Sequence, residues 1–108
     1  MDPEARFDEI VDELAPRGVL PGALFGSRSL TYEGKAFASF RGERLAVKLV
    51  GGSATHTEAL ALDGVQPFDP SGKGRPLKDW VAVPASQGQA WPRLTEAALA
   101  AVLGQGGA

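Results

Sequence analysis

The stretch Lys35–Val50, KAFASFRGERLAVKLV, decides the fold because it holds two extended segments joined by a tight turn. Gly42-Glu43 lies between the segments and matches a two-residue hairpin turn with glycine at its first central position. The second segment alternates apolar and polar residues, which is typical of a strand with one buried face. The residues that we expect to face the core are Leu45, Val47 and Leu49. Those that we expect to face outward, or against a partner, are Arg44, Ala46 and Lys48.

Helical spacing replaces this alternation near both ends of the chain. Asp2-Pro3-Glu4 predicts a helix start, because Asp caps a helix and Pro fits its first turn. Pro16 and Gly18 are expected to end this helix, and a last helix is expected from about Pro92 to Gly104. The apolar residues at helical spacing in the first helix are Phe7, Ile10, Val11 and Leu14.

The middle of the chain predicts a short helix followed by further strands. Gly51-Gly52 breaks the meander, and either Ser53 or Thr55 with Glu58 provides a cap for the helix that follows. Asp63-Gly64 is expected to close this helix. The two strands expected after it begin at Pro67 and at Trp80.

The predicted order of elements is α-β-β-β-α-β-β-α, allowing for one weakly marked strand near Gly22–Phe25. Strands that come in runs, instead of alternating with helices, indicate an α+β fold with an antiparallel sheet flanked by helices. Because the chain has 108 residues and no linker or repeat, we expect a single domain over residues 1–108.

Composition limits the classes of function. Hydrophobic residues make up 44% of the chain and charged residues 22%, which is typical of a globular domain. The absence of cysteine excludes disulfides and thiol chemistry, and the acidic start is unlike a secretory signal, so we expect a cytoplasmic protein. The net charge of -2 gives no overall attraction to nucleic acid, although residues 16–108 carry ten Lys and Arg against seven Asp and Glu.

The loop Ser71–Arg75, SGKGR, resembles a phosphate-binding loop at first sight. Pro67 stands where the first glycine of a P-loop is required, and Gly74 stands where its Ser or Thr hydroxyl is required. The segment therefore predicts a turn between strands, in which the glycines supply positive φ angles.

Ser53 and His56 are the combination that suggests nucleophilic catalysis. A working triad also needs a base oriented by a third group and an oxyanion hole, and only Glu58 lies close in the sequence. Capping explains Ser53 and a solvated helix position explains His56, while one histidine without cysteines leaves no metal-ligand set. We therefore predict no catalytic residue, no metal and no cofactor.

Cations and aromatic residues interleave along the meander, an arrangement by which some sheets bind single-stranded nucleic acid. The cations of this hypothetical face, for nucleic acid or another partner, are Lys35, Arg41, Arg44 and Lys48. Phe37 and Phe40 have opposite parity on one strand, so at least one of them belongs in the core. A further hypothesis is a small-ligand pocket between sheet and helices, lined by Phe25, Tyr32 and Trp80.

The order and spacing of several motifs resemble the TfoX/Sxy N-terminal-like domain family, from about Phe7 to Leu103. The motifs are LFG at 24–26, GKAFA at 34–38, RLAVKL at 44–49, EAL at 58–60, PFD at 67–69, GRPL at 74–77 and WVAVP at 80–84. The family pattern begins Met-Phe-Gly-Gly, whereas this chain has Leu24 and Ser27 at the first and last of these positions. The chain is also distantly similar to YjbR-type domains.

The resemblance implies a type III secretion chaperone-like α+β fold and no established catalytic residue. In the namesake proteins a helical domain follows, and the whole regulates competence genes; the sequence here ends four residues after Gly104, so we do not extend that role to it. We expect a non-enzymatic regulatory or protein-interaction domain with a protein partner, away from membranes, as a monomer or a homodimer. The alternatives are nucleic-acid binding by the basic face and binding of a small ligand.

Overall fold

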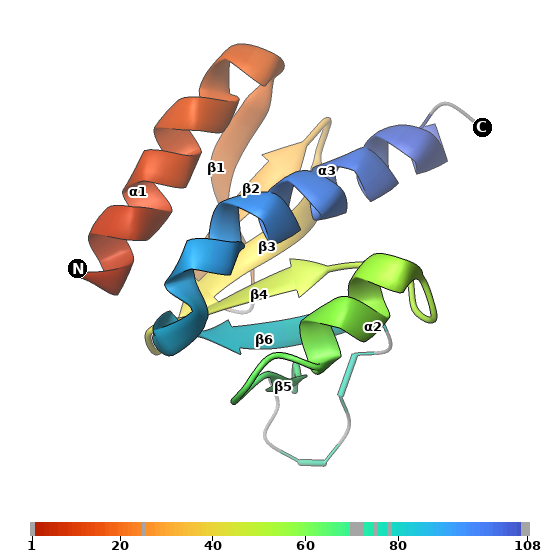
Figure 1. Ribbon diagram of the computed structural model, residues 1–108. Helices are drawn as coiled ribbons and strands as arrows, with labels where there is room; N and C mark the ends of the chain where they lie inside the picture. Colours follow the sequence, from red (N-terminus) through yellow and green to blue (C-terminus); the bar gives the residue numbers. More distant parts are fainter. Residues whose placement is uncertain (1, 25, 70–72, 75, 78, 107–108) are drawn as a thin grey trace.

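The computed structural model describes residues 2–24, 26–69, 73–74, 76–77 and 79–106. In this part of the chain, six strands form one antiparallel sheet in the order β1-β2-β3-β4-β6-β5, accompanied by three α-helices (Figure 1). The predicted α+β class is therefore confirmed. The helices are α1 (Pro3–Leu14), α2 (Ala54–Leu60) and α3 (Trp91–Gly106), with 3₁₀ turns η1 (Ala15–Arg17) and η2 (Ala85–Ala90). The strands are β1 (Val19–Leu24), β2 (Ser27–Tyr32), β3 (Lys35–Arg41), β4 (Arg44–Lys48), β5 (Gln66–Pro67) and β6 (Trp80–Pro84).

The weakly marked strand of the sequence becomes β1, so four strands precede α2 instead of three. β1 contains Pro21 and Gly22, which are poor strand formers, and it is held by pairing with β2 along its whole length. β1 and β5 are the two edges of the sheet, and β5 also contains a proline, Pro67. At the other end of the chain, α3 continues to Gly106, past the predicted end at Gly104.

Side-chain caps fix where the first two helices begin. The carboxylate of Asp2 accepts a hydrogen bond from the Glu4 N–H at 3.4 Å, as the sequence predicts for α1. The Ser53 Oγ accepts one from the His56 N–H at 3.1 Å, so Ser53 and not Thr55 caps α2. α2 ends at Leu60, earlier than the predicted stop at Asp63-Gly64.

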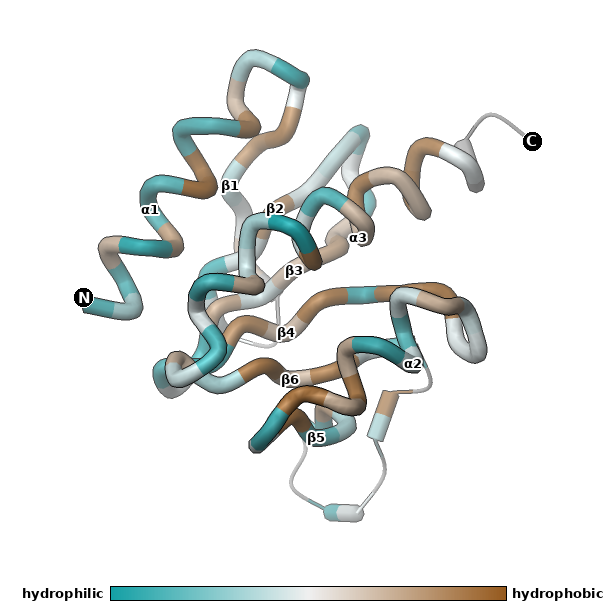
Figure 2. The backbone as a smooth tube through the Cα atoms, in the orientation of Figure 1, coloured by the Kyte–Doolittle hydropathy of each residue, from teal (hydrophilic) through white to brown (hydrophobic). Residues whose placement is uncertain are grey.

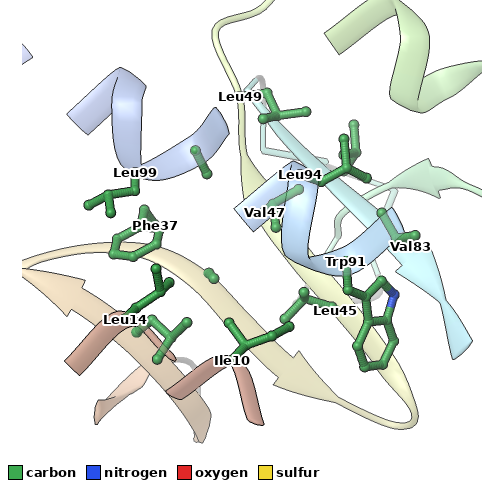
Figure 3. Close-up of a cluster of buried hydrophobic side chains, with 14 of the residues drawn as sticks. Ile10, Leu14, Phe37, Leu45, Val47, Leu49, Val83, Trp91, Leu94 and Leu99 are labelled. Carbon is green, nitrogen blue, oxygen red and sulfur yellow. The ribbon is translucent and has the colours of Figure 1, made fainter. Parts of the chain in front are cut away.

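All three helices pack on one face of the sheet and enclose the main core (Figures 1 and 3). Leu45, Val47 and Leu49 are buried there, which confirms the prediction from their alternation. The outer side of α1 is hydrophilic, whereas β4 and β6 are largely hydrophobic (Figure 2). The helices contribute the fully or nearly fully buried side chains of Phe7, Ile10, Leu14, Ala59, Trp91, Leu94 and Leu99.

A bulge in β3 brings both phenylalanines to this core. Leu30 of β2 lies opposite Ala38, but the next residue, Thr31, lies opposite Ala36, so Phe37 is an extra residue in β3. An extra residue inverts the alternation beyond it, so residues separated by an odd number of positions come to share a face. Phe37 is therefore fully buried, and Phe40 packs against the same core. The Phe40 ring stacks on Phe7 at 5.3 Å between centroids and meets Trp91 edge-on at 6.0 Å.

The β2–β3 turn and the β3–β4 turn each have positive φ at two successive residues. The φ angles are 50° for Glu33, 81° for Gly34, 56° for Gly42 and 63° for Glu43. Two positive φ angles define a type I′ turn, so Gly42-Glu43 is the predicted two-residue turn with glycine first, and Glu43 adopts a positive φ as well. The type I′ turn suits the twist of the strands, although it forces a glutamate into the left-handed region.

The opposite face of the sheet has a row of small residues across its width. The residues opposite one another in this row are Gly22, Ser29, Ser39, Ala46 and Ala82. Ala46, predicted to face outward or against a partner, is instead buried within the chain in a second cluster with Phe68, Trp80 and Ala82. Ser29 and Ser39 are also fully buried, and their hydroxyls find no hydrogen-bond partner among the described residues.

We expect Glu43→Asn to raise the free energy of unfolding by about 0.5–1 kcal/mol, because Asn tolerates the left-handed region better than Glu. Urea denaturation measures the change. Glu43→Gln serves as the control, since it removes the charge and keeps the unfavourable backbone angle. Equal effects of the two substitutions would show that charge, and not backbone conformation, determines the stability of this turn.

We expect Ser39→Ala to raise the free energy of unfolding by about 1 kcal/mol, because it removes a buried hydroxyl that has no partner. Thr95→Val is the matched control: the Thr95 hydroxyl is also buried, but it donates to the Trp91 carbonyl at 2.7 Å, so its removal is expected to destabilise. A loss of stability for Ser39→Ala as large as that for Thr95→Val would contradict the assignment.

Candidate functional site

A largely apolar cavity opens beside α2 at the β5–β6 side of the sheet. Its volume is about 230 Å³. We refer to it as the α2–β6 cavity, and the residues that line it are His56, Leu60, Pro67, Pro76, Leu77, Trp80 and Val81. Leu60, one of these residues, is 41% exposed.

The shortness of β5 explains why the wall of this cavity is not sealed by a strand. On this side of β6 the described chain pairs at Gln66 and Pro67, opposite Ala82 and Val81. After Pro67, two further backbone hydrogen bonds hold Trp80. The Phe68 N–H donates to the Trp80 carbonyl at 3.2 Å, and the Trp80 N–H donates to the Leu77 carbonyl at 3.2 Å. These bonds fix Trp80, and the ring of Phe68 lies against it at 5.7 Å between centroids.

His56 provides the polar side chain of the cavity. Its Nδ1 accepts a hydrogen bond from the Gly52 N–H at 3.4 Å, so a neutral ring carries its proton on Nε2. Two cations of β4 lie outside this lining: Lys48 lies opposite Trp80, and Arg44 donates to the Gln66 side chain at 3.4 Å. The arrangement is suited to bind an apolar group, with the His56 imidazole as the polar group beside it.

The structure does not bring the four predicted cations together. Arg44 and Lys48 alternate with Ala46 and so lie on the face opposite the helices, and Arg41 is paired with Arg44 on the same face. Lys35 is opposite Tyr32, which packs on the helix side, and both residues line a cavity with Val102 and Leu103 of α3. The bulge at Phe37 is the reason, because it inverts the alternation between Lys35 and Arg41.

The predicted pocket of Phe25, Tyr32 and Trp80 is divided in the same way. Tyr32 lines the cavity beside Lys35 and the end of α3, whereas Trp80 lines the α2–β6 cavity. Phe25 lies outside the described residues. Trp80 is thus the predicted pocket residue at the candidate site. Sequence reasoning did not assign His56, Leu60 and Leu77 to this pocket, although Leu60 and Leu77 belong to motifs that the family resemblance had marked.

Ser53 and His56 do not form a nucleophile–base pair. The contact between them runs from the backbone N–H of His56 to the Ser53 Oγ, which is a helix cap. Glu58, the nearby acid, forms an ion pair with Arg93 on α3. Within the described residues there is no group of three or more His, Asp or Glu side chains placed to hold a metal ion. Nor is any helix in that part of the chain long and apolar enough to cross a membrane.

In the described part of the glycine loop, a backbone N–H already binds a carboxylate of the protein itself. The Gly74 N–H donates to the Asp69 carboxylate at 2.7 Å, and Gly74 has a φ of 75°. A carboxylate on a loop N–H competes with a phosphate for that donor and repels it. The positive φ agrees with the predicted turn, while residues 70–72 and 75 lie outside the described part.

We expect Ser53→Ala to lower the free energy of unfolding by about 1 kcal/mol, because the first turn of α2 loses its cap. Thermal or urea denaturation measures the loss, and Thr57→Ala, an exposed substitution in the same helix, is the control. If Ser53→Ala left stability unchanged, the assignment of Ser53 as the cap would be wrong.

Comparison with known proteins adds no relative at this point. No protein-family model matches the chain, and no curated protein matches it in sequence. The similarity to the TfoX/Sxy N-terminal-like domains therefore stays a prediction from the motifs.

Proposed function

We propose that this domain is a non-enzymatic protein-interaction module that holds one apolar side chain of a partner peptide in the α2–β6 cavity. The observation that carries the proposal is the cavity itself, with its apolar lining and the exposed Leu60 at its rim. Pockets for drug-sized ligands usually measure about 300–1,000 Å³. At about 230 Å³ the cavity is smaller than that range, which favours a single side chain over a free small molecule.

Cations on β4, the strand paired with β6, favour an acidic peptide that extends past the cavity. Lys48 and Arg44 lie on the neighbouring strand, and neither forms an ion pair with a carboxylate of the described residues. The carboxylates of Asp69 and Asp79 accept hydrogen bonds from the N–H groups of Gly74 and Gly51, respectively. A partner with an aromatic or branched apolar residue flanked by Asp or Glu therefore complements the site.

The affinity expected of such a site is low. Burial of one apolar side chain contributes about 1.5–3 kcal/mol, and exposed charge pairs add about 0–1 kcal/mol each. Weak and reversible capture suits a regulatory module, which is the role that the family resemblance implies. Regulation of a partner protein is accordingly part of the proposal.

Selection from a displayed peptide library, followed by NMR titration of the selected peptides, tests the proposal. We expect selected peptides to share an apolar anchor beside acidic residues and to shift the indole N–H resonance of Trp80. Leu60→Asp should weaken binding about tenfold or more, because it places a charge at the apolar rim. The control is Leu20→Asp: Leu20 is 63% exposed on β1, at the far edge of the sheet.

Two results would overturn the proposal. One is peptide binding that Leu60→Asp and Leu20→Asp leave equally unaffected. The other is a Trp80 response to a single-stranded oligonucleotide at low salt, lost in Arg44→Glu and Lys48→Glu, without any peptide binding. That second outcome supports the nucleic-acid alternative, since such binding depends on cations and falls with salt.

A further inference from the structure

Another cavity lies at the other end of β6, between the start of α1 and the turn that leads into α3. Its volume is about 210 Å³. We refer to it as the α1–η2 cavity, and the residues that line it are Pro3, Arg6, Ala85, Ser86, Gly88, Gln89 and Trp91. It differs from the α2–β6 cavity because a guanidinium, a hydroxyl and an amide group line it.

Arg6 is the positive charge of this cavity, and it has no carboxylate partner. Its side chain lies over Gly88, where a β-carbon placed on the glycine would be 3.5 Å from the Arg6 Cδ and Nε atoms. Among the described residues, Arg6 forms neither an ion pair nor a side-chain hydrogen bond. A guanidinium with unused donors at a cavity wall is suited to bind a carboxylate or phosphate.

Other arginines of this protein form ion pairs with carboxylates. Arg28 donates to Asp8 at 2.7 Å and to Glu4 at 3.3 Å, and the pKa of Arg28 is raised, chiefly by the bond to Asp8. Further arginine–glutamate pairs are Arg17 with Glu96 and Arg93 with Glu58. Although α1 is rich in acids, Arg6 is thus left for a group from outside the described chain.

Trp91 provides an independent observation. Its side chain is fully buried, and its indole N–H has no hydrogen-bond partner among the described residues. A buried donor without an acceptor is unfavourable, so an acceptor that reaches it gains more than it would in water. Figure 3 shows the indole nitrogen on the side of the ring turned toward Val83 of β6, which is itself fully buried.

We propose that the α1–η2 cavity binds a small oxyanion, either a carboxylate or a phosphate group. The Arg6 guanidinium is its charged partner, the Ser86 hydroxyl and the Gln89 amide are further donors, and Trp91, which also lines the cavity, reports on its occupation. The cavity also lies at the N-terminus of α3, where the helix dipole favours negative charge. This site is separate from the peptide site and does not depend on it.

The chain has two tryptophans, one at each cavity, so one NMR experiment separates the two sites. The wild-type protein is titrated with sodium phosphate and, separately, with sodium succinate, at fixed pH and at an ionic strength held constant with sodium chloride. We expect one or both anions to shift the Trp91 indole resonance in a saturable way and to leave the Trp80 resonance in place. The two titrations decide between phosphate and carboxylate.

Arg6→Gln is expected to weaken anion binding about tenfold or more, since one charge-assisted bond is lost, and Arg6→Lys is expected to weaken it less. Arg17→Gln is the matched control, because it removes the same charge away from the cavity. Circular dichroism verifies that each variant is folded. The proposal is wrong if neither anion gives a saturable Trp91 shift, if chloride gives the same shift, or if Arg6→Gln binds as tightly as Arg17→Gln.

Discussion

The single extra residue in β3 determines how the two faces of the sheet are used. With Phe37 inserted, Phe37, Ala38 and Phe40 all contribute to the core under the helices, which no regular strand allows. The stacked rings of Phe7 and Phe40, with Trp91 edge-on, then fix α1 and the start of α3 against the middle of the sheet. Loss of the bulge would move one of these aromatic groups to the opposite face.

The two cavities follow from this packing. α1 and the start of α3 meet over the aromatic cluster, and the α1–η2 cavity lies where the chain turns between them. At the β5 side of the sheet, the helix layer ends with α2, and β5 is too short to cover β6 near Trp80. Each cavity thus forms where a covering element stops, and the chemistry of each follows from the residues left at that point: apolar at α2, cationic at α1.

Much of the fold was predictable from local signals. The alternation of Leu45, Val47 and Leu49 depends only on neighbouring residues, and so does the cap of α1 at Asp2. β1 was weakly predicted because Pro21 and Gly22 disfavour a strand, and only its long-range pairing with β2 makes it one. The bulge was not predictable, because KAFASF has no glycine or other local mark at Phe37.

The same limit applies to the candidate sites. Lys35 and Arg41 are six residues apart, so a regular strand would place them on one face, and the unpredicted bulge separates them. Trp80, predicted to line a pocket with Phe25 and Tyr32, lines the α2–β6 cavity instead with residues that include His56 and Leu60 of α2, which are distant in sequence. A role for Arg6 could not be predicted from the sequence, because its lack of an ion-pair partner depends on which side chains the fold places around it.

The prolines at the two edges of the sheet have a consequence for how molecules of this protein meet. A strand from a second molecule that aligned with β1 would find no N–H at Pro21, and one that aligned with β5 would find a two-residue strand ending in Pro67. Backbone hydrogen bonds between the sheets of two molecules would therefore be interrupted at either edge strand, β1 or β5. A proline in each edge strand thus disfavours open-ended pairing of these edges from molecule to molecule.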